Sequence, residues 1–214
     1  MQKTIGHGTH AKKKALHPIE QKRPDVQEKR NNWVENLQPQ LDINKIVFLD
    51  ESSIDTGMTG LYGRAPTNER VNDYVPDVRF QRTSVLSTIR LDGAQIPIVF
   101  DGTLNGKLFK KYVDDFLSPS LSEGDIVILD NSSVHRAKGV LDSIAARGAV
   151  ALFLPPYSPD FNPIELMWSK VKSTLRALKA RSPETLVDAL NYALSSITPD
   201  DIANWFRHDG YALQ

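Results

Sequence analysis

The chain has 214 residues, 40% of them hydrophobic, and carries 26 basic and 26 acidic side chains. This length predicts one domain with a core of its own, and the even charge balance neither indicates nor excludes nucleic acid as a partner. The absence of cysteine excludes disulfides, zinc thiolate sites and cysteine nucleophiles. Because the sequence shows neither a signal peptide nor an apolar run of membrane-spanning length, we expect a cytoplasmic protein without a membrane partner.

Basic residues are concentrated at the start of the chain. Residues 1–30 carry eight basic and three acidic side chains, and glycine and proline interrupt the first 24 residues. We therefore expect residues 1–40 to form a basic linker or arm with one short helix, over 24–37. Such an arm suits contacts with DNA phosphates, for which Lys12, Lys13 and Lys14 are the candidates. A solvated tail explains the same charge pattern equally well.

Residues 41–214 are expected to form the folded domain. An apolar run predicts a buried strand over 43–50, and glycines at 57, 60 and 63 predict a hairpin around 58–65. Asp92-Gly93 is a strong hairpin signal between two further strands. The remaining predicted elements are strands 82–91 and 96–100, helix 105–117, strand 126–129, helix 133–147, strand 150–154, and helices 163–179 and 183–194.

This order of elements predicts an α/β fold. Antiparallel strands come first, and parallel strands with crossover helices follow, which gives a mixed five-stranded sheet flanked by helices. The RNase H-like fold has this order, with acidic residues on its first strand, its fourth strand and a late helix. The predicted elements therefore favour that fold.

Three acidic residues stand at the borders of predicted elements. Asp50 and Asp130 each follow an apolar run, and Glu165 is the third residue of a helix after the proline-rich stretch 154–164. Carboxylates held close together raise one another's pKa, so such a cluster favours a bound cation. Ligation by carboxylates alone indicates Mg²⁺ or Mn²⁺, here two ions, and phosphoryl chemistry. Taken singly, each aspartate could be a turn residue and Glu165 could belong to a capping box.

The predicted helix that begins near Glu165 carries basic residues behind it. At about 100° per residue, Lys172, Arg176 and Lys179 lie within about 40° of the direction of Glu165. This stripe favours contacts with a phosphate backbone beside a metal ligand, although a solvated basic face remains an alternative. His135 is more simply explained as a hydrogen-bonded structural histidine.

Several motifs resemble the DDE endonuclease domain of IS630-type transposases, within the Tc1/mariner group. The most specific is Pro-Pro-Tyr-Ser-Pro-Asp-Phe-Asn-Pro-Ile-Glu at 155–165, and 34 residues separate Asp130 from Glu165 (165 − 130 − 1). The other matching segments are 48–52, 58–66, 129–135 and 205–211. The resemblance implies that Asp50, Asp130 and Glu165 are the catalytic triad, and that the protein needs Mg²⁺.

The resemblance also implies partners and one open alternative. It predicts double-stranded DNA as substrate, namely transposon inverted repeats and a target cut at TA, with a homodimer pairing two ends and the protein associated with the nucleoid. Transposases of this family carry helix-turn-helix modules ahead of the catalytic domain, and this chain lacks them. A separate or fused product is expected to supply them. The alternative is a non-catalytic fragment that dimerises with a full-length transposase and inhibits it.

Overall fold

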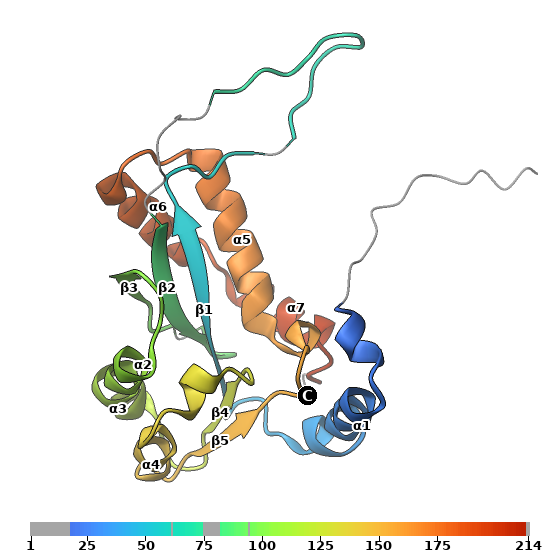
Figure 1. Cartoon of the computed structure of the whole chain (residues 1–214), viewed down its shortest axis with the longest axis vertical. Helices are drawn as coiled ribbons and strands as arrows, with labels where there is room; N and C mark the ends of the chain where they lie inside the picture. The colour runs from blue at the N-terminus through green and yellow to red at the C-terminus, as the bar shows by residue number, and fades with distance from the viewer. Residues whose placement is uncertain (1–17, 61, 75–81, 94, 213–214) are drawn as a thin grey trace, which may run out of the picture.

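Apolar and β-branched residues build a five-stranded mixed sheet at the centre of the molecule (Figure 1). The computed structural model describes residues 18–60, 62–74, 82–93 and 95–212. The strand order is β3-β2-β1-β4-β5, with β1 antiparallel to β2 and parallel to β4. The prediction of a mixed five-stranded sheet is therefore confirmed. The strands are β1 Ile46–Asp55, β2 Arg82–Ile89, β3 Ile98–Asp101, β4 Ile126–Leu129 and β5 Val150–Phe153.

Helices cover both faces of the sheet. Proline occupies the first position of α5, α6 and α7, where its missing N–H costs no hydrogen bond. The α-helices are α1 Pro24–Asn32, α2 Gly106–Tyr112, α3 Ser118–Ser120, α4 Val140–Ala145, α5 Pro163–Leu178, α6 Pro183–Ser195 and α7 Pro199–His208. Short 3-10 or π segments are η1 Ile19–Lys22, η2 Trp33–Leu37, η3 Gln38–Gln40, η4 Val113–Leu117, η5 Ser133–Arg136 and η6 Pro159–Phe161.

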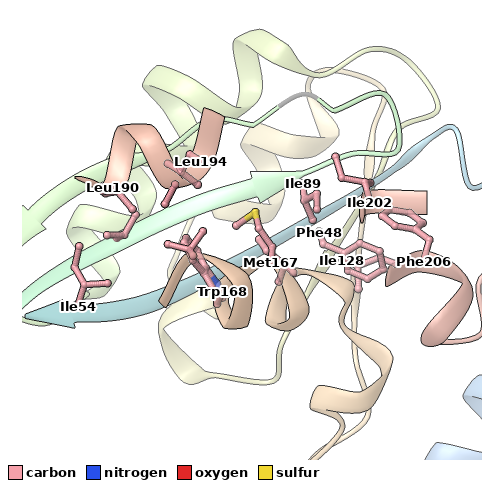
Figure 2. Close-up of a cluster of buried hydrophobic side chains, with 14 of the residues drawn as sticks. Phe48, Ile54, Ile89, Ile128, Met167, Trp168, Leu190, Leu194, Ile202 and Phe206 are labelled. Atoms are coloured by element: carbon pink, nitrogen blue, oxygen red, sulfur yellow. The ribbon is translucent and has the colours of Figure 1, made fainter. Parts of the chain in front are cut away.

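The two-residue period of β1 divides the core into two layers. Phe48 and Ile54 face a cluster formed with α5, α6 and α7, which Figure 2 shows in close-up. Val47 and Leu49 face the opposite cluster, formed with α2, η4 and α4. Because successive side chains of a strand point to opposite faces, Asp50 belongs to the face of Phe48 and Ile54, on which α5 packs.

The structure corrects three predictions and adds one helix. β1 does not end at Asp50 but continues to Asp55, because β2 pairs with it from Phe48 onward. The hairpin predicted around 58–65 is wrong: among the described residues of 57–74, none lies in a strand or helix. The single helix predicted at 133–147 is interrupted between Arg136 and Val140: η5 ends before Ala137, whose ψ is 144°, and Gly139, with a φ of 82°, is the N-cap of α4. Helix α7 was not predicted.

The N-terminal segment packs against the domain from residue 18 onward. Val26 of α1 and Trp33 of η2 are each 2% exposed, and Trp33 belongs to the same core cluster as Phe48. In Figure 1, α1 lies beside the turn that leads into α5. Residues 1–17, which include Lys12, Lys13 and Lys14, lie outside the described residues. No helix among the described residues is long and apolar enough to span a membrane.

Candidate active site

The parallel register of β1 and β4 places two of the predicted acids side by side. The register ends at the pair Leu49–Leu129, so Asp50 and Asp130 are the next residues on two neighbouring strands. Asp50 continues in β1 opposite Ser87 of β2, whereas Asp130 is the first residue after β4. The two carboxylates therefore come from the carboxyl end of the parallel pair, where α/β proteins collect ligands.

Helix α5 brings the third acid to the same place. Asn162 precedes the helix and Glu165 is its third residue, as predicted from the proline spacing. The backbone N–H of Asn162 donates to Pro159 O at 3.1 Å, so it does not need the Glu165 side chain as a cap. Helices α6 and α7, in contrast, both begin with capping boxes. The carboxyl group of Glu165 is thus left for the site.

The electrostatics show that the three acids act on one another. Burial raises the pKa of Asp50 well above its ordinary value, and the carboxylates of Glu165 and Asp130 raise it further. Burial also raises the pKa of Glu165, against the lowering effect of the Lys172 ammonium, while Asp130 adds to the rise. Asp50 and Glu165 are therefore more costly to ionise in the presence of the neighbouring carboxylates.

Asp130 differs because a histidine stabilises its charged form. His135, in η5, is 3% exposed, and its Nδ1 lies 2.6 Å from Asp130 Oδ1. The Ser132 N–H donates to the same oxygen at 2.9 Å. Burial would raise the pKa of Asp130, but the contacts with His135 and Ser132 outweigh it and hold the pKa below its usual value. His135 was predicted to be a structural histidine, and the structure shows that its partner is a site carboxylate.

The acids border two hollows in the surface. The larger, of about 420 Å³, is lined by Asp50, Asp130 and Glu165 together with residues of the β5–α5 turn. A second, of about 200 Å³, is lined by Asp50 and Asp130 with Glu51 and His135. Asp50 and Asp130 therefore lie between two hollows and can be reached from both of them.

The predicted basic stripe of α5 divides into two parts. Lys172 is close enough to Glu165 to lower its pKa. Arg176 and Lys179 lie farther along the helix and line a hollow of about 930 Å³ with residues of the segment between β1 and β2. Lys179 Nζ bonds to both carboxylate oxygens of Asp73 at 2.8 Å, so its charge is already paired. Trp168, buried at 2%, belongs to the core.

The three carboxylates are the kind of ligand that a hard divalent cation prefers, but their side chains do not lie close enough together to hold one. Among the described residues, no group of three or more histidine, cysteine, aspartate or glutamate side chains is arranged so that it could hold a metal ion as it stands. All three candidate ligands are carboxylates, which suit Mg²⁺ or Mn²⁺. A cation between them would also offset the repulsion that raises the pKa values of Asp50 and Glu165.

The sheet order and the flanking helices define an RNase H-like fold. Residues 45–187 match the model of the DDE superfamily endonuclease family, and the chain belongs to that family. This confirms the resemblance to a DDE endonuclease domain. No curated protein matches the sequence.

Solved structures of one transposase share the fold. The chain is similar to Mos1 transposase in a paired-end complex with the left transposon end, with a TM-score of 0.76 and 18% identity over 94% of this chain. The Mos1 strand transfer complex gives a TM-score of 0.73 at 18% identity, again over 94% of this chain. The catalytic domain of Mos1 mariner transposase gives 0.57 at 16% identity, over 90% of this chain and 97% of that one. The chain spans 63% of the length of the Mos1 protein in the first two complexes.

Proposed function

We propose that this chain is the catalytic domain of an IS630-type transposase of the Tc1/mariner group, which cuts DNA at transposon ends and joins the ends to target DNA. The observation that carries the proposal is the meeting of Asp50, Asp130 and Glu165 at one hollow, at the carboxyl end of β1 and β4. The match of residues 45–187 to the DDE superfamily endonuclease family supports it.

The three acids have distinct roles in this proposal. Asp50 and Asp130 would hold Mg²⁺ or Mn²⁺ together, and Glu165 would help to hold a second ion. The bound cations supply charge that lowers the pKa of the attacking hydroxyl and stabilises the departing oxygen. His135 and Ser132 keep Asp130 ionised and in a fixed orientation through Oδ1.

The proposed reaction consists of two displacements at phosphorus. In the first, water attacks the scissile phosphodiester, the bond from phosphorus to the 3′-oxygen breaks, and that oxygen takes up a proton to become a 3′-hydroxyl. In the second, this hydroxyl loses its proton and attacks a phosphodiester of the target, whose own 3′-oxygen departs. One phosphodiester is made for each one broken, so the joining step needs no external source of energy.

The proposal also includes the DNA contacts and partners. Lys172 is the best placed of the α5 residues to contact a DNA phosphate beside Glu165. Arg176 and Lys179 would contact phosphates farther along the same DNA strand. Lys12, Lys13 and Lys14 remain candidates on the arm. The proposal also includes inverted repeats as substrate and TA as target. It further includes pairing of two copies, a helix-turn-helix part supplied by the same or another chain, and association with the nucleoid.

Metal-dependent nicking of a supercoiled plasmid tests the chemistry. The wild-type chain is compared with Asp130→Ala, and with Asp188→Ala, which removes the same charge from an exposed position on α6. We expect Mg²⁺- or Mn²⁺-dependent nicking by the wild type and by Asp188→Ala, and none by Asp130→Ala. Equal inactivity of three folded proteins would contradict the proposal and favour the non-catalytic fragment, which inhibition of a full-length transposase would then test.

Target choice is measured separately, with oligonucleotides that carry a pre-cut end. Sequencing of the joined products should show TA at the insertion sites. Joining without preference for TA would leave the DDE chemistry intact and refute the narrower assignment to this transposase group.

A further inference from the structure

The turn between β5 and α5 forms one wall of the larger hollow and leads directly to Glu165. Residues 154–159 and Asn162 line the hollow together with the three acids. Within this turn, Tyr157 has a φ of 57°, in the left-handed region that side chains with a Cβ rarely adopt. A tyrosine stays in that region only when its surroundings hold it there.

Arg30 of helix α1 makes many of the contacts that keep Tyr157 in this conformation. Its Nη1 donates to Tyr157 O at 3.2 Å and to Ser158 Oγ at 2.7 Å. The same guanidinium pairs with both carboxylate oxygens of Asp160, at 3.0 and 2.6 Å. Its Cζ also lies 4.4 Å from the centre of the Phe161 ring. One side chain thus contacts four of the five residues 157–161 of the turn.

The neighbouring contacts show that Arg30 is more shielded and more extensively bonded than a simple surface ion pair. Gln21 Nε2 donates to Tyr157 O at 2.7 Å, so two side chains from the N-terminal segment bind the strained residue. The side chain of Arg30 is 17% exposed. Arg23, by comparison, pairs with Asp25 on the same segment and is 58% exposed. A shielded, multidentate arginine holds its partners in a fixed geometry more firmly than an exposed pair does.

We infer that Arg30 is a positioning residue for the active site. From helix α1, outside the segment 45–187 that the family model matches, it fixes the turn 157–161 and so the wall of the hollow and the approach to Glu165. The inference rests on the proposed function, because it assumes that the hollow is where DNA reacts. It makes the N-terminal helix part of the catalytic unit, because a displacement of α1 would move Arg30 and with it the turn.

Amide hydrogen exchange tests whether Arg30 stabilises the turn, and it does not require the protein to be active. The amides of Phe161, Asn162 and Glu165 donate to Ser158, Pro159 and Asn162, and these bonds report on the turn. In Arg30→Ala we expect these amides to exchange about tenfold faster or more, while amides of α6 keep their wild-type rates. Arg30→Lys should be intermediate, and Arg23→Ala should match the wild type.

Nicking kinetics then test the effect on the site. For Arg30→Ala we expect kcat to fall by about 10- to 100-fold with the KM for DNA unchanged, because the wall and Glu165 lose their alignment while the DNA-binding surface remains. Arg30→Lys should recover part of kcat, and Arg23→Ala should behave as the wild type.

The outcomes separate this inference from the proposed function. If the wild type nicks DNA and Arg30→Ala nicks it equally well, the inference is wrong and the proposed function stands. If amides of α6 accelerate together with those of the turn, Arg30 only stabilises the whole domain, which also overturns it. If the wild type does not nick DNA, the proposed function fails, and unchanged exchange in the turn would refute the hold as well.

Discussion

Asp209, at the end of α7, carries a buried carboxyl group whose hydrogen bonding is incomplete. The residue is 6% exposed, and its Oδ1 lies 2.7 Å from His208 Nδ1. Its Oδ2 is buried and has no hydrogen-bond partner among the described residues. Burial raises the pKa of Asp209 from 3.8 to about 6, against the lowering effect of His208 and with added repulsion from Asp160 and Glu165. Substitution by asparagine removes the charge and keeps the shape.

The sign and size of the effect follow from the raised pKa. Between pH 3.8 and about 6 the folded protein binds the Asp209 proton more tightly than the unfolded chain does. The free energy of unfolding therefore falls as the pH rises through this window, and the contribution is lost above about pH 6. A rise of about two pKa units corresponds to about 3 kcal/mol at most, and partial solvation reduces this to about 1–2 kcal/mol.

The assay compares urea unfolding of the wild type and Asp209→Asn from pH 4 to pH 8. Other shifted groups, such as Asp50 and Glu165, occur in both proteins and largely cancel in the difference. We expect the stability of Asp209→Asn relative to the wild type to rise by about 1–2 kcal/mol between pH 4 and pH 8. A difference that stays constant with pH would refute the reasoning, because any cost of burying the new amide is itself independent of pH.

Three further predictions concern other residues. Arg90→Met leaves the fully buried Asp125 without its bidentate partner. The free energy of unfolding, measured in urea at pH 7, should fall by about 3–5 kcal/mol, and a fall below about 1 kcal/mol would contradict this. Lys172→Gln should weaken DNA binding and reduce the dependence of log K on log salt by about one unit, measured in a salt series; an unchanged slope would exclude a phosphate contact. His135→Ala should raise the pKa of Asp130, measured by carbon NMR of the carboxyl group, and should reduce nicking by about 10- to 100-fold. An unshifted pKa would show that the 2.6 Å contact between His135 and Asp130 does not stabilise the carboxylate.

Local patterns in the sequence were sufficient for the elements that carry the site. The strand predicted at 126–129 agrees with β4 residue by residue, and the helix predicted at 163–179 ends one residue later than α5. Both have strong local signals, an uninterrupted apolar run and a proline at the first helical position. The same signals led to Asp50, Asp130 and Glu165, because two similar strands in parallel register must place their following residues side by side.

Two of the features that the sequence did not reveal depend on partners that are distant in sequence. Glu51-Ser52-Ser53 interrupts the apolar run, so β1 was predicted to end at Asp50, although β2 extends the pairing to Asp55. Arg30 and Asp160 are 130 residues apart, and no local pattern connects them. For α7 a usable signal was present, since Thr198 and Asp201 form a capping box ahead of apolar residues at helical spacing.

The continuation of β1 beyond Asp50 makes the three acids unequal in their freedom to move. Asp50 lies within a strand that stays paired with β2 as far as the pair Asp55–Arg82, so its backbone cannot shift without breaking that ladder. Asp130 is the first residue beyond β4, and Glu165 lies in the first turn of α5, where backbone constraints are weaker. Any backbone movement that changes the spacing of the acids must therefore come from Asp130 and Glu165. β1 provides the one position against which the others adjust.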